Sequence, residues 1–283
     1  RPGLARHWAV LLSLPVIYTR GSMGKVRPLL GLLKPELPIA AGICVVVGQA
    51  LALGAAPGID IALLGFLIGL LISGSEMVSN DLFDLEVDRI NHPDRPLPSG
   101  KVSVSEVVLF TIILSLSGLL LAAILGHLTL MFTAFIWVLG MLYNWKLKSL
   151  GLPGNAIVAL SVGMTFVLGG MTVDRLDSGL VWTFALMASL FDLAEEISGG
   201  VMDAEGDALR GSRSLAILYG RRTALTCVTL LFSIFIVLGT IPFLLGWLGL
   251  PYLVLIIMAD ATIAFLVVRL WRARTPKEGR KVQ

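Results

Sequence analysis

Charged residues are scarce in this chain of 283 residues, because Asp, Glu, Lys and Arg together make up only 14%. An ordinary soluble domain has about 25%. Hydrophobic residues make up 56%, and the mean hydropathy is +0.88. A globule of this size could not bury so much apolar surface, so the composition excludes a typical soluble enzyme, a disordered chain, a collagen and a coiled coil. It is typical of a polytopic α-helical membrane protein.

Cysteine and histidine are also rare. Cys44 and Cys227 lie inside long apolar runs without metal-ligand spacing, and we interpret them as small core residues. The histidines, His7, His92 and His127, show no ligand spacing either. The apolar runs are continuous rather than alternating, which excludes a transmembrane β-barrel. We therefore expect an all-α transmembrane bundle whose environment is the lipid bilayer, with no nucleic-acid partner.

The apolar runs predict eight membrane-spanning helices, at about 20 residues for each. They lie near 36–55, 60–79, 104–125, 128–146, 153–172, 180–198, 223–243 and 251–270. Residues 1–22 contain a shorter apolar stretch, 8–19, interrupted by Pro15. We expect this segment to be a tag, a trimmed or displaced segment, or a ninth helix, with an interfacial segment as the alternative. Residues 23–283 are expected to form one transmembrane domain.

Lysine and arginine are distributed unevenly over the connections between the predicted spans. The connections after the second, fourth, sixth and eighth spans carry nearly all of them, and the opposite connections carry only Arg175. Short loops rich in Lys and Arg remain in the cytoplasm. We therefore predict an integral protein of the cell membrane with the polar connections 80–103 and 199–222 on the cytoplasmic side.

Acidic residues gather at the end of the second predicted span. Asn80, Asp84 and Asp88 are spaced i, i+4, i+8, so they share one face of a helix, and Glu76 extends this face one turn back into the span. Charges inside the hydrocarbon are costly and often functional. A stripe of oxygen ligands suits Mg²⁺, which protein sites commonly share with substrate phosphates.

The next segment, 89–101, contains three prolines and a glycine, which predict a rigid, non-helical loop. We expect this loop to hold Arg95 and Lys101 near the acidic stripe. Asp81 lies off the stripe, and we expect it to pair with Arg89 or Arg95. Acids that hold Mg²⁺ beside bases that hold phosphate are suited to a polyphosphate ligand.

A second acidic cluster follows the sixth predicted span. Asp203 and Asp207 are spaced i, i+4, and Arg210 follows them. Further acids lie near the end of the span itself: Asp192, Glu195 and Glu196. Two acidic clusters on one side of the membrane predict two metal sites that face each other across one cavity.

Other polar residues have simpler interpretations. Glu86 and Glu205 are expected to be solvated helix ends. Asp260, deep in the last predicted span, is interpreted as a hydrogen-bonded or protonated packing residue, with a functional acid as the alternative. At the end of the fourth span, three residues are expected to line the cavity: Tyr143, Asn144 and Lys146.

One sequence pattern resembles the first aspartate-rich motif of the UbiA superfamily of intramembrane prenyltransferases. Acids, proline, arginine and glycine agree in order and spacing over Asn80, Asp81, Asp84, Asp88, Asn91, Pro93, Arg95, Pro96, Ser99 and Gly100. The stretch from Asp203 to Asp207 is similar to the second motif, and Lys34-Pro35 resembles an Arg-Pro of the family. The resemblance extends over nearly the whole chain from about residue 27.

Within the superfamily, the end of the first motif and the Lys146-x-Lys148 segment are most similar to the archaeal digeranylgeranylglyceryl phosphate synthases, although chlorophyll synthases share part of this pattern. The chain also departs from the family. Many members carry an Arg-Glu pair and a base before the second motif, where this chain has Glu195-Glu196 and Gly199-Gly200. The family has nine spans, one more than the eight predicted here.

The resemblance implies Mg²⁺-dependent transfer of a polyprenyl group from an allylic diphosphate to a lipid-soluble acceptor, here a geranylgeranyl group to geranylgeranylglyceryl phosphate. It implies two Mg²⁺ ions, held by Asn80, Asp84, Asp88, Asp203 and Asp207, with Asp84, Asp203 and Asp207 as catalytic residues. Basic residues would hold the diphosphate: Arg95, Lys101, Lys146 and Arg210. Further residues would line the cavity: Glu76, Tyr143, Asn144, Asp192 and Glu196. Prenylation of an aromatic or quinone precursor and an ion-coupled transporter are the alternatives.

Overall fold

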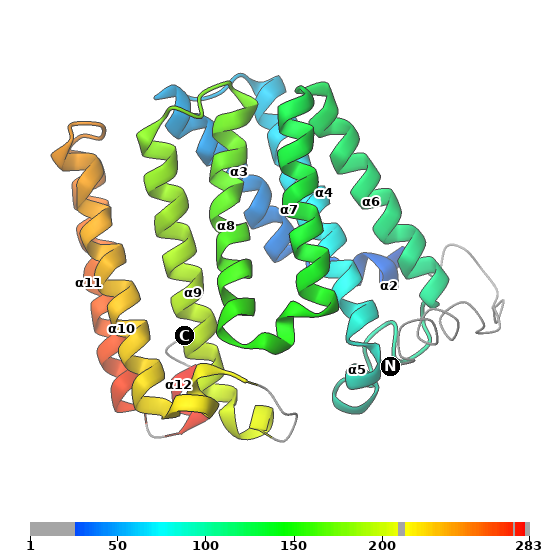
Figure 1. Cartoon of the computed structure of the whole chain (residues 1–283). Helices are drawn as coiled ribbons and strands as arrows, with labels where there is room; N and C mark the ends of the chain where they lie inside the picture. The colour runs from blue at the N-terminus through cyan, green and yellow to red at the C-terminus, as the bar shows by residue number, and fades with distance from the viewer. Residues whose placement is uncertain (1–25, 209–212, 274, 281–283) are drawn as a thin grey trace.

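The computed structural model describes residues 26–208, 213–273 and 275–280, without the side chains of residues 203, 205–208, 276 and 277. All regular elements in these ranges are helices, and Figure 1 shows them. In chain order they are α2 (Val26–Gly31), α3 (Glu36–Leu53), α4 (Ile59–Phe83), α5 (Leu85–Asn91), α6 (Val104–Ile124), α7 (His127–Trp145), the 3₁₀ helix η2 (Leu147–Leu150), α8 (Leu152–Thr172), α9 (Gly179–Ala208), α10 (Leu215–Leu244), α11 (Leu250–Arg272) and α12 (Pro276–Arg280).

Seven described helices are long and apolar enough to cross a membrane: α3, α4, α6, α7, α8, α10 and α11. They agree with seven of the eight predicted spans to within a few residues, except that α4 ends four residues late and α10 begins eight residues early. Gly220, with φ 84°, separates the first residues of α10 from its long apolar part. The remaining prediction, 180–198, corresponds to the first part of α9, where three acids lower the hydropathy. The predicted ninth helix lies outside the described residues.

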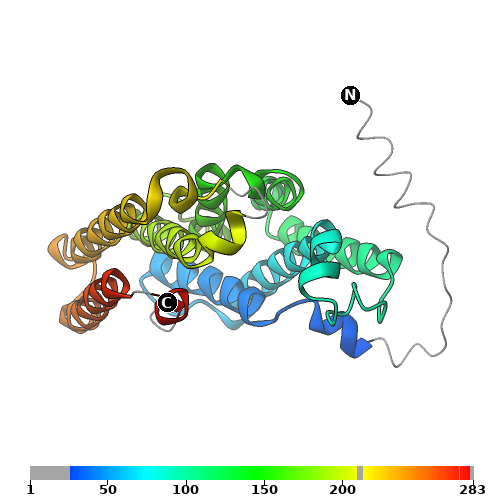
Figure 2. The same ribbon diagram turned by 90° about the horizontal axis from the view of Figure 1, so that it is seen from below.

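The helices form two facing groups (Figures 1 and 2). In the view along the bundle, α3 and α4 lie on one side and α7, α8 and α9 on the other, while α10 and α11 extend the bundle beyond α9. The contacts agree with this arrangement, since α3 packs against both α4 and α8, and α9 packs between α8 and α10. A cavity between the two groups is therefore bounded by α3, α4, α7, α8 and α9.

Small residues allow α3 to approach its neighbours closely. A Cβ atom at Gly48 or Gly169 would overlap backbone atoms of α8 or α3, respectively, and Gly42 packs directly on Phe66 of α4. Close packing through small residues is the usual way in which membrane helices associate, because lipid gives no hydrophobic driving force between them. These contacts hold together the walls of the cavity.

Large apolar side chains cover the outer surface. On α11, for example, Leu255 and Met258 are more than 60% exposed, and so is Leu120 on α6. In water such rows would promote association, but in a bilayer they face lipid. The exposed apolar surface of the helices therefore agrees with the transmembrane bundle predicted from composition.

Candidate active site

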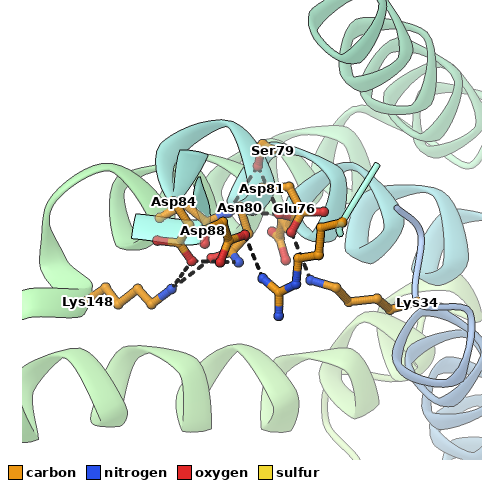
Figure 3. Close-up of polar contacts among 10 residues, drawn as sticks. Lys34, Glu76, Ser79, Asn80, Asp81, Asp84, Asp88 and Lys148 are labelled. Carbon is orange, nitrogen blue, oxygen red and sulfur yellow. Dashed lines mark hydrogen bonds and ion pairs between the residues drawn. The ribbon is translucent and has the colours of Figure 1, made fainter. Parts of the chain in front are cut away.

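Two residues of the first acidic stripe form a cation site that holds the ammonium group of a lysine from another part of the chain (Figure 3). The Lys148 Nζ lies 2.5 Å from Asp84 Oδ2 and 3.2 Å from Asn80 Oδ1. The Asn80 side-chain amide donates to the same Asp84 oxygen at 3.1 Å. An ammonium group thus bridges two oxygen atoms that the helical i, i+4 spacing places side by side.

The three residues of the stripe span the junction at Asp84, where α4 ends and α5 begins. The backbone N–H of Asp84 donates to the Asn80 carbonyl, and that of Asp88 donates to the Asp84 carbonyl. Asp84 therefore closes α4 with its N–H and opens α5 with its carbonyl, so Asn80 and Asp88 each lie one helical turn from Asp84.

Asp88 is held by the loop that follows it. Arg95 Nη1 donates to Asp88 Oδ2 at 2.6 Å, and the carboxylate is only 5% exposed. The loop is anchored by Leu97 and Val102, which are buried in the same apolar cluster as Leu85 of α5. Arg95 therefore lies beside the stripe, as expected from the proline-rich segment.

Asp81 has a different partner from the one predicted. It forms an ion pair with Lys34 Nζ at 2.9 Å rather than with Arg89 or Arg95. Asp81 lies 100° away from Asn80 around the helix, and its carboxylate meets Lys34 just before the start of α3. Arg89 lies in α5, so the predicted non-helical loop begins three residues later than expected, after Asn91. The partner of Asp81 is the lysine of the Lys34-Pro35 segment. In the sequence, this segment resembles an Arg-Pro of the family, but the resemblance predicts no ion pair for it.

The turn that carries Lys148 depends on Gly151. This residue has φ 71° and ψ −125°, a conformation that side chains strongly disfavour, and a Cβ atom here would overlap the carbonyl oxygen of Arg213. The turn is thus packed against the segment that follows α9. It brings Lys148 between the two acidic regions, within electrostatic range of Glu196 on α9 as well as of Asp84.

A cavity of about 520 Å³ opens from this cation site into the bundle. A volume of this size is typical of sites for small molecules and cofactors. Its polar end contains residues from four elements: Glu76, Asn80, Tyr143, Asn144, Lys148, Asp192 and Glu196. Five of the six residues predicted to line the cavity are among them, and Lys146 is not. The rest of the wall is mainly apolar, formed by Leu37, Ala40, Ala41, Cys44, Gly69, Ile72, Ser73, Met77, Phe132, Thr133, Ile136, Gly140, Ile157, Val158, Ser161, Val162, Met164, Thr165 and Leu168.

Two carboxyl groups in this wall have an oxygen without a hydrogen-bond partner among the residues that the structure describes. They are Oε1 of Glu76 and Oδ2 of Asp192, both buried. The Glu76 carboxyl lies against Gly140, where a side chain would overlap it. Asn144 fixes the neighbouring backbone, because its amide donates to the Glu76 carbonyl at 2.8 Å and to Ser79 Oγ at 3.0 Å. The polar end of the cavity therefore offers free acceptor atoms on two opposite helices.

Other predicted site residues are either outside the cavity lining or among the residues and side chains that the structure does not describe. Among the described residues, Lys101 hydrogen-bonds only to the Asp94 carbonyl within its own loop, at 3.4 Å, and the exposed side chain of Lys146 forms no hydrogen bond or ion pair. Asp203 and Asp207 lie in the last turns of α9, but their side chains are outside the described part of the chain, as is Arg210 altogether. Asp260 is buried in α11 and its Oδ1 lacks a partner, so the predicted hydrogen-bonded packing is not seen at that atom.

The donor atoms of the first stripe suit Mg²⁺, which prefers carboxylate and amide oxygens. The Lys148 ammonium stands in for a metal cation between Asn80 Oδ1 and Asp84 Oδ2, so this pair already binds positive charge. Among the described side chains, no three His, Cys, Asp or Glu residues come together as a complete metal-binding group. Asn80 Oδ1 and Asp84 Oδ2 are positioned to bind a cation. A complete metal site would need further ligands, from solvent, from the substrate or from side chains that the structure does not describe.

Sequence comparisons identify related proteins along most of the chain. A digeranylgeranylglyceryl phosphate synthase from Methanopyrus kandleri is 37% identical over 84% of this chain and 86% of its own length. Another protein of that name, from Thermococcus kodakarensis, is 35% identical over 83% and 85%.

Solved structures show the same fold. One, described for digeranylgeranylglyceryl phosphate synthase in membranes, has a TM-score of 0.77 and 30% identity, and the match covers 91% of both chains. A UbiA homologue from Archaeoglobus fulgidus bound to DMAPP and Mg²⁺ has a TM-score of 0.68 at 21% identity, with 87% of this chain and 88% of that chain covered. The family model described as the UbiA prenyltransferase family matches residues 41–283. The chain therefore belongs to the UbiA prenyltransferase family.

Proposed function

We propose that this prenyltransferase moves a geranylgeranyl group from geranylgeranyl diphosphate to geranylgeranylglyceryl phosphate within the membrane. The observation that carries the proposal is a cavity with a charged mouth and an apolar interior, which matches a diphosphate joined to an isoprenoid tail. Relatives named digeranylgeranylglyceryl phosphate synthase, at 37% and 35% identity over most of the chain, support this choice of substrates.

The residues of the mouth would bind and orient the diphosphate. Lys148 can leave Asp84 and donate to a phosphate oxygen, since its flexible stem ends in three donors. Arg95 reaches the same region while it pairs with Asp88. Bound Mg²⁺, held by the stripe oxygens, would supply positive charge to the leaving diphosphate.

The second acidic cluster would complete the metal site. We propose that Asp203 and Asp207 hold a second Mg²⁺ opposite the first stripe and that Arg210 assists with the diphosphate, together with Lys101 and Lys146. Support comes from α9, which remains helical through Asp207 and so keeps the i, i+4 pair on one face. The Archaeoglobus fulgidus homologue bound to Mg²⁺ and DMAPP adds support for the metal but leaves the number of ions open.

The reaction needs an acceptor for the proton of the attacking hydroxyl group. The oxygen of the acceptor forms a bond to the allylic carbon while the bond from that carbon to the diphosphate breaks, and the hydroxyl proton leaves. We propose that the carboxylate of Asp203 accepts this proton. The apolar wall excludes water from the allylic carbon, which favours transfer over hydrolysis.

We also propose that α9 is an eighth membrane span and that the acidic mouth faces the cytoplasm. With 30 residues α9 is long enough to span, and it packs between α8 and α10, which both meet the criteria for a span. Asp192 and Glu196 line the cavity instead of facing lipid, which lowers the cost of placing these two acids at membrane depth. The excess of Lys and Arg on the connections at this end supports the cytoplasmic orientation.

The proposal is tested by incubating membranes that contain the protein with geranylgeranyl diphosphate and a panel of acceptors, followed by identification of the product by mass. The panel includes geranylgeranylglyceryl phosphate, 4-hydroxybenzoate and a quinone precursor. We expect the diether lipid as the main product. Prenylation of an aromatic acceptor instead would support the first alternative, and ion-driven uptake without any prenylated product would support a transporter.

A further inference from the structure

An ion pair holds the last turn of α4 from outside the cavity. The Lys34 Nζ lies 2.9 Å from Asp81 Oδ1, and the side chain of Asp81 is only 3% exposed. Asp81 immediately follows Asn80, one of the two residues that hold the Lys148 ammonium group. Neither Lys34 nor Asp81 is among the residues that line the cavity. The pair is therefore adjacent to the cation site without being part of it.

The backbone of Lys34 is strained. Its φ is 46°, in the left-handed region that residues other than glycine, asparagine and aspartate rarely occupy. Pro35 follows directly, and the Lys34 carbonyl accepts a hydrogen bond from the N–H of Leu37 in the first turn of α3. Strained residues of this kind persist only where the surrounding structure holds them, and they gather at functional sites. The structure thus keeps a lysine at a position that favours glycine, and its side chain contacts Asp81.

The segment before α3 is anchored in a buried apolar cluster. Leu32 belongs to the same cluster as Val78 and Leu85, which lie three residues before and four residues after Asp81. The cluster also contains the residues that anchor the loop of Arg95. Packed side chains of this kind resist displacement. The ammonium group that meets Asp81 is therefore carried by a segment that is fixed against the end of α4.

Asp84 lies between two buried ion pairs. Its backbone, with φ −89° and ψ 0°, ends α4 and begins α5, so regular helix geometry does not continue through this residue. On one side of it Lys34 holds Asp81, and on the other side Arg95 holds Asp88. The pair that Asp84 itself forms is more exposed, with 24% for its carboxylate. Both sides of the junction are thus fixed, while the cation at the junction is accessible.

We propose that Lys34 is a positioning residue, which acts through Asp81 to fix the junction at Asp84. The inference rests on the proposed function, in which Lys148 leaves Asp84 for a phosphate oxygen. Asp84 and Asn80 have to keep their places at that moment, because the ammonium group no longer bridges them. Lys34 is suited to this role, since it contacts Asp81 outside the cavity and does not compete with the substrate.

A first experiment compares Lys34→Met, Asp81→Asn and the variant with both changes. Each should lower kcat for prenyl transfer by about 10- to 100-fold, the usual effect of removing a group that supports metal ligands. The double variant should be no more impaired than either single variant, because all three lose the same contact. At saturating Mg²⁺, KM for geranylgeranyl diphosphate should change by less than about threefold, since neither residue lines the cavity.

Two further variants serve as controls. Lys34→Arg keeps the positive charge opposite Asp81 and should restore most of kcat. Arg27→Met removes an exposed charge from α2, in the segment just before Lys34, and should leave kcat and the unfolding temperature unchanged. Asp81→Asn and the double variant leave no unpaired buried charge, so they keep the inference testable if Lys34→Met fails to fold.

Binding of Mn²⁺ gives a readout that does not depend on turnover. Mn²⁺ prefers the same oxygen ligands as Mg²⁺, and EPR measures the free ion, so titration of the protein with Mn²⁺ alone reports cation affinity. Lys34→Met and Asp81→Asn should weaken Mn²⁺ binding at least about tenfold, whereas Arg27→Met should not. Thermal unfolding in detergent with EDTA measures any loss of stability separately.

The outcomes distinguish positioning from other roles. If Lys34→Met and the double variant lose activity while Asp81→Asn keeps it, Lys34 acts without Asp81 and the inference is wrong. Additive losses in the double variant would also overturn it. So would a lower unfolding temperature with wild-type kcat and Mn²⁺ affinity in the folded protein, because the pair would then contribute only stability. Absence of any prenylated product with a folded wild type would contradict the proposed function instead, and the Mn²⁺ titration would still test the ion pair.

Discussion

Asp84 has a central position among the polar residues of the mouth, because it contacts both Asn80 and Lys148. We expect Asp84→Asn to lower kcat/KM by about 10²–10³-fold, the usual scale when one preorganised charge is removed from an active site. The measurement is the initial rate of diether formation in detergent. Glu86→Gln is the matched control, since Glu86 is exposed and lies two residues away. An equal loss of kcat/KM in this variant would show that any negative charge near this helix end has the same effect, and that Asp84 has no specific role.

The two lysines of the Lys146-x-Lys148 segment differ in their contacts. Both are exposed, but of the two only Lys148 forms an ion pair with the acidic stripe among the described residues. We therefore expect Lys148→Met to lower kcat/KM for the diphosphate by about 10²-fold and Lys146→Met to lower it only a few fold. The reverse order would indicate that the turn rearranges when the donor binds and that Lys146 is the phosphate ligand.

At the scale of the element, the contact between α3 and α8 depends on the absence of a side chain at Gly169. A Cβ atom there would overlap the Val45 carbonyl, with backbone atoms of Gly48 and Gln49 also close. Backbone cannot move aside as a flexible side chain can, so Gly169→Ala should destabilise the fold by about 1–3 kcal/mol. Thermal unfolding in detergent measures this effect.

Gly31→Ala is the control for this prediction, because no atom lies within 4 Å of a Cβ at that helical position. Its unfolding temperature should stay within a few degrees of the wild type. If both variants unfold at the wild-type temperature, the close approach of α3 and α8 is not a source of stability.

At the scale of the whole molecule, catalysis and folding should respond differently to removal of metal. Chelation with EDTA should abolish transfer and added Mg²⁺ should restore it, because the stripe oxygens need a cation to bind the diphosphate. The unfolding temperature should change little, since the described helices are held by apolar clusters and small-residue contacts. Full activity in EDTA would contradict the metal site.

The orientation in the membrane is a second property of the whole molecule. In a variant without Cys44 and Cys227, a membrane-impermeant maleimide added to intact cells should label Asp177→Cys but not Ser99→Cys. Asp177 is in the connection between α8 and α9, at the end opposite the mouth, and Ser99 is in the loop beside the stripe. The opposite labelling pattern would place the mouth outside the cell.

The sequence by itself determined the transmembrane class, seven of the spans to within a few residues at most ends, and the proximity of Asn80 and Asp84. These properties depend on local periodicity and on transfer to lipid, which act through near neighbours in the chain. Only the tertiary structure decided that Lys148 meets Asp84 and that Lys34 meets Asp81, because 64 and 47 residues separate these partners. The cavity likewise depends on how α4, α7 and α8 pack together, and helix packing follows from side-chain contacts that hydropathy does not encode.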